Sequence, residues 1–303
     1  METPFRPEAL YPDDLERFPP LSEYLKNLEY LKKYDFSNHS IDQIEKIFFE
    51  KATILPNLFG LRQATNFRDP LYRVRLNINS NNEDLTLIRT YSYPPGSVCR
   101  SNGRANLKGR SVFYCSHDPI TALLECKPEN GNLAYLSVWQ PRATRDIKYA
   151  MCMPKNLSTS NPWLEISNNV HAFSDLYSRE HASEKSEHFK ALYQFVADQF
   201  VNELEPYYIT SWLSEKLLYG GLWRDFIFYP SFVRRSENFN LAFHPNSVEE
   251  HLRFEKVIKF KFLGIIEQKI RITDVEIGKP NLTSIEWNND VESDLLQLGI
   301  IGD

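Results

Sequence analysis

The hydrophobic period of the chain changes along its length, and this order restricts the fold more than any other feature of the sequence. Apolar residues recur at helical spacing over residues 19–51, which is typical of amphipathic helices. Alternation by two begins at residue 71 and indicates strands with one buried face. The helical period returns over residues 183–219, and strands follow from residue 225. Helices and strands are grouped rather than regularly alternating, which predicts an α+β fold.

The sequence of 303 residues divides into three parts. Residues 1–65 form an N-terminal helical extension, residues 66–275 a central domain, and residues 276–303 a C-terminal tail that thins into loop and short strands. Ser40 and Gln43 are spaced as a capping box at the start of the second helix. We expect the extension to pack as a helical cap on the central domain. A separate partner-binding module is the alternative.

Charge and cysteine usage exclude several classes of function. The net charge is −5 and Lys and Arg form no block, so nucleic acid is not a predicted partner. The four cysteines form no C-x-x-C pair and are interpreted as reduced thiols of a cytoplasmic protein. No run reaches the ~18 apolar residues of a membrane span. His181 and His188 lie in a charged helical stretch, which predicts a solvated face rather than a metal site.

Glu125 is the polar residue that most needs an explanation, because it ends an apolar helical turn. Asp118 and Pro119 predict the start of this helix, as its N-cap and its first residue. A buried carboxylate is costly unless another group pairs with it. Glu125 therefore has either a structural partner or a ligand.

Further polar residues lie on apolar elements or beside glycines, although common nucleotide, metal and hydrolase motifs are absent. Arg104 and Asn106 lie in a glycine-flanked loop, where the backbone can approach a ligand closely. Arg73 and Arg75 are two positions apart on a predicted strand and share a face. Spacing alone does not choose between these two arginines.

The order of these residues resembles the RES domain, the toxin half of RES–Xre toxin–antitoxin systems. That family is named for an arginine, a glutamate and a serine in this order along the chain. The matching motifs here are LYRV, GRAN, SVFYCS, ITALLE, IFYPS and NFNLAFHP, and they span residues 71–263. Three departures are visible. Ala105 replaces the usual tryptophan of the second motif, and the region between Glu125 and Ser231 is longer than in compact members. The N-terminal helical segment is also extra.

The resemblance implies a fold like that of ADP-ribosylating toxins, with a split, mostly antiparallel β-core, flanking helices and a cleft for NAD. NAD is then the substrate, its nicotinamide–ribose bond is cleaved, and no metal is expected. The residues assigned to catalysis are Arg73, Tyr114, Glu125 and Ser231, and those assigned to NAD binding are Arg104, Asn106 and Tyr72.

Each catalytic assignment has a chemical reason. A carboxylate such as Glu125 stabilises the positive charge that develops on the ribose. An arginine such as Arg73 binds a diphosphate bidentately and stays charged. The ring of Tyr114 offers a flat face to nicotinamide. The hydroxyl of Ser231 would fix the ribose or the carboxamide.

The acceptor of the ADP-ribosyl group is left open by the sequence. Water or phosphate as acceptor gives a glycohydrolase or phosphorylase that depletes cellular NAD. A protein side chain as acceptor gives an ADP-ribosyltransferase that modifies a macromolecule. A degenerate RES-like binding protein is a third reading. The resemblance also implies an Xre-type antitoxin as partner, and a homo-oligomer is left open.

Overall fold

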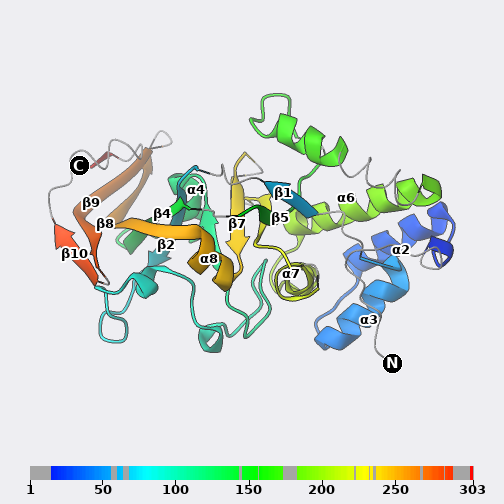
Figure 1. Cartoon of the computed structure of the whole chain (residues 1–303), viewed down its shortest axis with the longest axis horizontal. Coiled ribbons are helices and arrows are strands. Elements are labelled where there is room, and N and C mark those ends of the chain that lie inside the picture. The colour runs from blue at the N-terminus through cyan, green and yellow to red at the C-terminus, as the bar shows by residue number, and fades with distance from the viewer. Residues whose placement is uncertain are drawn as a thin grey trace. The chain divides into compact units, whose positions relative to one another are not determined.

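The chain crosses repeatedly between two units, each built from three separate stretches of sequence (Figure 1). The helical unit comprises residues 1–62, 96–110 and 148–232, and the sheet unit comprises residues 63–95, 111–147 and 233–303. The computed structural model describes residues 15–55, 60–63, 68–142, 145–155, 157–172, 183–221, 223–231, 233–234, 237–266, 269–282, 284–288 and 301–302.

The N-terminal helices pack against later helices of the helical unit. Helix α2 (Leu21–Lys33) contacts α6 (Ser186–Asn202), and α3 (Ile41–Ala52) contacts α7 (Ile209–Ser214). A π-helical turn, Glu215–Tyr219, continues α7. The helical period of the sequence is confirmed in all these segments.

Buried aromatic rings join the early and late helices. The ring centroids of Phe48 and Trp212 are 4.5 Å apart, and both side chains are fully buried. The indole N–H of Trp212 donates to Glu45 at 3.4 Å, and Lys216 pairs with the same carboxylate at 2.7 Å. Because their largest apolar side chains fill the interior of this unit, helices α2 and α3 are integral to it.

The helix-start signals of the sequence are confirmed. The backbone N–H of Gln43 donates to Ser40 Oγ at 3.3 Å, and the N–H of Ser40 donates to Gln43 Oε1 at 2.8 Å, which completes the capping box. Asp118 accepts from the N–H of Thr121 at 2.7 Å and caps α4 (Pro119–Glu125). Each such cap satisfies a backbone donor that the helix itself leaves unpaired.

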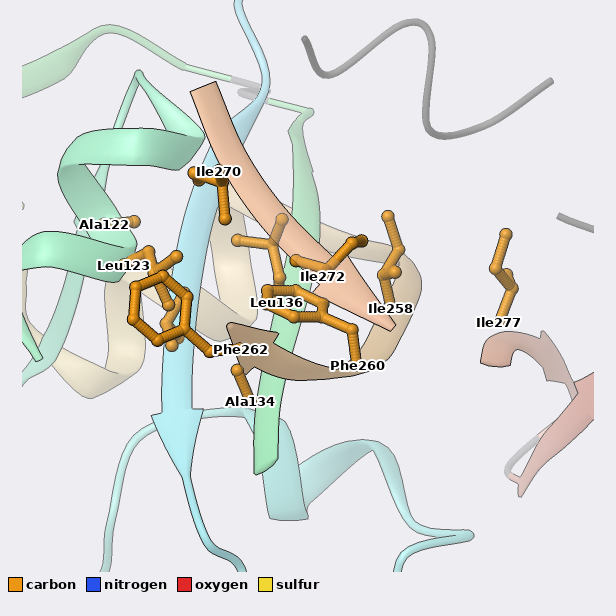
Figure 2. Packing of buried hydrophobic residues seen from close by; sticks show 11 residues of the cluster. Ala122, Leu123, Ala134, Leu136, Ile258, Phe260, Phe262, Ile270, Ile272 and Ile277 are labelled. Carbon is orange, nitrogen blue, oxygen red and sulfur yellow. The ribbon is translucent and has the colours of Figure 1, made fainter. Parts of the chain in front are cut away.

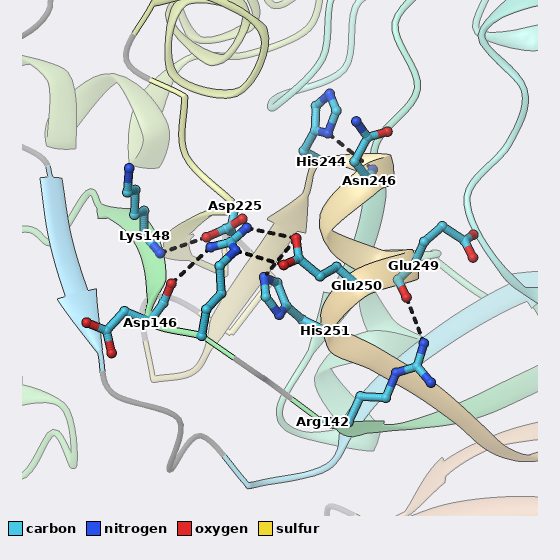
Figure 3. A network of polar contacts seen from close by, with 10 residues as sticks. Arg142, Asp146, Lys148, Asp225, His244, Asn246, Glu249, Glu250 and His251 are labelled. Atoms are coloured by element: carbon cyan, nitrogen blue, oxygen red, sulfur yellow. Dashed lines mark hydrogen bonds and ion pairs between the residues drawn. The ribbon is translucent and has the colours of Figure 1, made fainter.

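Three short strands belong to the helical unit, in the order β1 (Gly60–Gln63), β5 (Ile147–Met151) and β6 (Phe226–Pro230). Strands β5 and β6 are parallel, with Tyr149 opposite Phe226. The backbone N–H of Lys148 also donates to Asp225 Oδ2 at 2.7 Å (Figure 3). The prediction of helix up to residue 65 is wrong for β1, because four residues beside a strand edge gain more hydrogen bonds by pairing than by forming one helical turn.

The sheet unit is an antiparallel sheet in which strands distant in the sequence are neighbours. Its strand order is β7-β3-β2-β4-β8-β9-β10, with β11 parallel to β9. The strand bounds are β2 Leu71–Leu76, β3 Phe113–Ser116, β4 Leu133–Pro141, β7 Phe239–Phe243, β8 Leu252–Ile266, β9 Lys269–Asn281, β10 Ser284–Asn288 and β11 Ile301–Gly302. Antiparallel strands beside segregated helices confirm the α+β class.

The core of the sheet unit lies between α4 and one face of the long strands. Figure 2 shows Ala122 and Leu123 of α4 beside the buried side chains of β4, β8 and β9, among them Leu136, Phe260 and Phe262. Fully burying one such large apolar side chain contributes about 1.5–3 kcal/mol. The apolar face of α4 is therefore held rigidly on the sheet.

Strand β9 continues through residue 275, where the predicted tail begins. Ile277 is 1% exposed and belongs to the same core cluster. The expectation of loop and short strands is wrong for the end of β9, which is part of a strand of 13 residues. Its polar and glycine residues weaken the alternating pattern, and pairing with β8 and β10 on both sides compensates for this.

Candidate functional site

Strands β2 and β3 separate almost as soon as they meet. Their paired register is limited to Tyr72 opposite Ser116, whereas β2 pairs with β4 along its whole length. The backbone of β3 instead pairs with β7 over four residues, from Phe113 opposite Phe243 to Ser116 opposite Asn240. The sheet therefore opens between β2 and β3, and the predicted site residues of the sheet unit lie around this opening.

Arg73 bridges the opening. Its Nη1 donates to the backbone carbonyl of Tyr114 at 3.0 Å, and its guanidinium lies 5.4 Å from the ring centroid of Phe113. Its Nε is buried without a hydrogen-bond partner among the described residues. Desolvation by burial lowers the pKa of Arg73 to about 10, so the side chain remains cationic at neutral pH. Arg73 is thus a desolvated cation with donor capacity left over.

Arg75 lies on the same face of the strand, and its guanidinium is held by structural partners. Its guanidinium forms a bidentate ion pair with Glu83, at 2.6 and 2.8 Å, and donates to the carbonyl of Thr90 at 2.6 Å. These contacts fasten the loop after β2 to the strand. Of the two arginines that spacing leaves equivalent, Arg73 has the environment of a binding residue.

Helix α4 brings Glu125 to the same region. The side chain is half-buried, and its Oε1 accepts from Asn240 Nδ2 at 2.7 Å. The next residue, Cys126, donates its thiol to the carbonyl of Val74 at 3.4 Å. The end of the helix is therefore tied to β7 by one residue and to β2 by the next, on the two sides of β3. Asn240 is a structural partner of Glu125.

Reasoning from the sequence did not single out Asn240, which contacts the predicted site residue Glu125. Asn240 lies on β7, where all five residues are buried, and is itself 6% exposed. An amide in the middle of an otherwise apolar strand needs a partner for its polar atoms. That signal was present in the sequence, but the identity of the partner was not.

The register places three further polar groups on one face. Tyr114 and Ser116 are two apart on β3, and Tyr72 and Asn240 lie opposite Ser116 on either side. Tyr72 and Tyr114 are both half-buried. Burial raises the pKa of Tyr72, and the carboxylates of Glu255 and Asp118 raise it further, so its hydroxyl stays protonated.

A helix and its hydrogen bonds hold the far end of β7. Helix α8 (Pro245–His251) follows this strand at once, and His244 Nδ1 accepts from the N–H of Asn246 at 3.2 Å. Arg142, which follows β4, donates to the carbonyl of Glu249 at 2.8 Å (Figure 3). Strand β7, which carries Asn240, is thereby anchored at its C-terminal end as well as along its register.

Arg104 and Asn106 belong to the helical unit, where both have structural partners. Arg104 donates to the carbonyl of Phe200 at 2.8 Å and stacks 4.7 Å from the ring centroid of Tyr207. Asn106 is 9% exposed and donates to the carbonyl of Leu107 at 2.9 Å. Their assignment to NAD binding stays a prediction.

Ser231 also belongs to the helical unit. It follows β6 directly, as its motif predicts, and is fully buried. Four of the predicted site residues belong to the sheet unit and lie around the opening: Arg73, Tyr114, Glu125 and Tyr72. The other three belong to the helical unit: Arg104, Asn106 and Ser231.

The structure describes one of the two histidines of the charged helical stretch and all four cysteines. His188 is 6% exposed and hydrogen-bonds the carbonyl of Pro19 at 2.9 Å, so the prediction of a solvated face was wrong for it. His181 lies outside the described residues. All four cysteines are free, and burial raises the pKa of Cys126 to about 11. Across the described ranges, no three His, Cys, Asp or Glu side chains gather as metal ligands.

The helices of the described part of the chain include none with the length and apolar character that crossing a bilayer requires. Comparison with curated proteins finds no match. Comparison with family models matches the RES domain over residues 70–262, which is more than half of the chain. This range contains Arg73, Glu125 and Ser231, the arginine, glutamate and serine of the motif order. The chain belongs to the RES-domain family.

Proposed function

We propose that this chain is an NAD-consuming enzyme that cleaves the nicotinamide–ribose bond. The observation that carries the proposal is the arrangement around the opening between β2 and β3. A carboxylate, Glu125, is held there by an uncharged donor, and a desolvated arginine, Arg73, has an unused buried N–H. The opening in an antiparallel sheet also supports an ADP-ribosyltransferase-like core.

The chemistry requires a negative group beside the ribose. When the bond between the ribose and the nicotinamide nitrogen breaks, its electron pair leaves with nicotinamide, which becomes neutral. Positive charge then develops on the ribose, and the carboxylate of Glu125 stabilises it electrostatically. An acceptor adds to the ribose and gives up its proton, which completes the reaction. The leaving group is already cationic in NAD, so the step needs no added acid.

The other residues bind and orient NAD. Arg73 would hold the diphosphate, because a desolvated guanidinium forms strong, directed bonds to phosphate oxygens. Tyr114 would present its ring to nicotinamide. Ser231, Arg104, Asn106 and Tyr72 retain the binding roles that the family resemblance implies. In a cell, such an enzyme would act as a toxin by depleting NAD, with an Xre-type protein as its restraining partner.

The experiment is an analysis of products from NAD incubated with the purified full-length chain. The proposal predicts release of nicotinamide together with one ADP-ribosyl product. Parallel reactions in water, in phosphate buffer and with cell proteins then identify the acceptor, as free ADP-ribose, ADP-ribose 1″-phosphate or modified protein. If NAD remains intact in all three reactions, the proposed activity is wrong and a binding role replaces it.

A further inference from the structure

Asn240 is a buried amide in the apolar strand β7. Asn240 is 6% exposed, so its side chain is almost removed from solvent. Burying an amide is unfavourable unless a hydrogen bond compensates. Asn240 Nδ2 makes this bond to Glu125 Oε1 at 2.7 Å, across 115 positions of sequence. The short distance is typical of a bond to a charged acceptor.

Glu125 needs a donor from outside its own helix. It is the last residue of α4, where the carbonyls of Leu123 and Leu124 accept from the N–H of Cys126. Backbone carbonyls at a helix C-terminus repel a carboxylate. The glutamate side chain also has several rotatable bonds, so without a partner it would sample many positions. The amide of Asn240 answers both needs, because it offsets the repulsion and fixes one oxygen.

The amide of Asn240 carries no charge, and this has a consequence for the chemistry. A lysine or arginine in the same place would neutralise the carboxylate and weaken its effect on a developing positive charge. An amide holds the carboxylate and leaves its charge intact. Asn240 is itself held by strand pairing with Ser116 and by the anchored end of β7.

We propose that Asn240 is a positioning residue for the NAD-cleaving carboxylate: it fixes Glu125 at the edge of the opening between β2 and β3 without reducing its charge. This inference rests on the proposed function, because it assigns Glu125 the role of stabilising the ribose cation. It assigns a role to an asparagine of the NFNLAFHP motif, for which the resemblance gave none.

The first test compares Asn240→Ala with Asn238→Ala in nicotinamide release. Asn238 is the matched control, since it lies two residues away and its amide reaches Asp118 at the opposite end of α4, at 3.5 Å. Asn240→Ala is expected to lower kcat by roughly 10- to 100-fold with a much smaller change in KM. Asn238→Ala is expected to leave kcat within about threefold of the unaltered protein.

The second test measures the pH dependence of kcat for Asn240→Asp. A residue with a merely structural role would not change this dependence. At acid pH the new carboxyl is protonated and can donate to Glu125 as the amide does, so activity should be partly restored. As pH rises, the two adjacent carboxylates both ionise and repel each other. The variant should therefore lose kcat with rising pH, over a range where the unaltered protein does not.

The outcomes separate the two proposals. If the unaltered protein releases nicotinamide and Asn240→Ala does so equally fast, Asn240 has no positioning role and the proposed function stands. An Asn240→Asp profile that parallels the unaltered protein has the same meaning. If the unaltered protein releases none, the proposed function fails first. Thermal unfolding of each variant, followed by circular dichroism, shows that the compared proteins are folded.

Discussion

The helical unit and the sheet unit treat a half-buried arginine in opposite ways. In the helical unit, Arg104 is held by the carbonyl of Phe200 and the ring of Tyr207. In the sheet unit, Arg73 makes one bond, to the carbonyl of Tyr114, and keeps a buried N–H without a partner among the described residues. Residues of the family motif therefore differ in their surroundings: the guanidinium of Arg104 is held by a carbonyl and a ring, whereas Arg73 keeps a buried donor that could bind a ligand.

The largest change in the free energy of unfolding is expected from a substitution in the aromatic core of the helical unit. Trp212→Ala removes a fully buried indole between α3 and α7, and we expect a loss of about 3–5 kcal/mol in the free energy of unfolding. Trp223→Ala, at an indole that is 50% exposed in the same unit, should change it by about 0.5 kcal/mol or less. Urea unfolding curves measure both. Equal effects would show that the N-terminal helices contribute little to this unit.

The next effect compares the two arginines of β2. Arg73→Ala should lower kcat/KM for NAD by roughly 10- to 100-fold, because a charged hydrogen bond to a phosphate is lost. Arg75→Ala should mainly lower the urea midpoint, because Glu83 and Thr90 lose their partner. Steady-state kinetics and unfolding, measured on both variants, test the difference. The opposite pattern would identify Arg75 as the binding residue.

A smaller effect is expected at Arg104. Arg104→Ala removes the contacts to Phe200 and Tyr207, so it should lower the free energy of unfolding by about 1–3 kcal/mol. The kcat/KM of the folded fraction for NAD is then the sensitive measurement. A large fall in kcat/KM with unchanged stability would break the comparison, and would confirm the NAD-binding role that the sequence predicts.

The smallest effect is a dependence of stability on pH. Burial lowers the pKa of His188, and nearby Lys185 lowers it further, against the hydrogen bond to the carbonyl of Pro19. The unfolded chain therefore binds more protons than the folded one below about pH 6.5, and stability should fall as pH decreases through that value. Urea midpoints at pH 7.5 and 5.5 measure this fall. His188→Gln should show a smaller difference between the two midpoints.

Local pattern was enough to predict much of the fold. The alternation around Tyr114, the cap formed by Asp118 and the helical spacing over residues 186–202 all depend on neighbours in sequence, and all are confirmed. The burial of His188 could not be predicted in this way, because its partner, Pro19, is 169 positions away. A charged stretch of helix gives no sign that a distant segment covers one of its faces.

For the site as well, local sequence predicts some features and tertiary structure determines the others. Motif order was enough to predict Arg73 and Glu125 as candidate site residues, since each lies in a short local signature. The different surroundings of Arg73 and Arg75 could not be predicted, because they depend on Glu83 in a following loop. Nor could the link from Asn240 to Glu125, which depends on the register of β3 with β7 and on where α4 ends. Polar pairing across strands is decided by tertiary structure.

Glu125 is proposed to stabilise the ribose cation when NAD is cleaved. The most direct measurement is the rate of nicotinamide release at saturating NAD by the unaltered chain, by Glu125→Gln and by Glu129→Gln, an exposed control four residues away. We expect Glu125→Gln to be slower by roughly 100- to 1,000-fold, because it keeps the shape of the side chain and loses its charge. Glu129→Gln should match the unaltered chain. Equal rates for all three proteins would contradict the account.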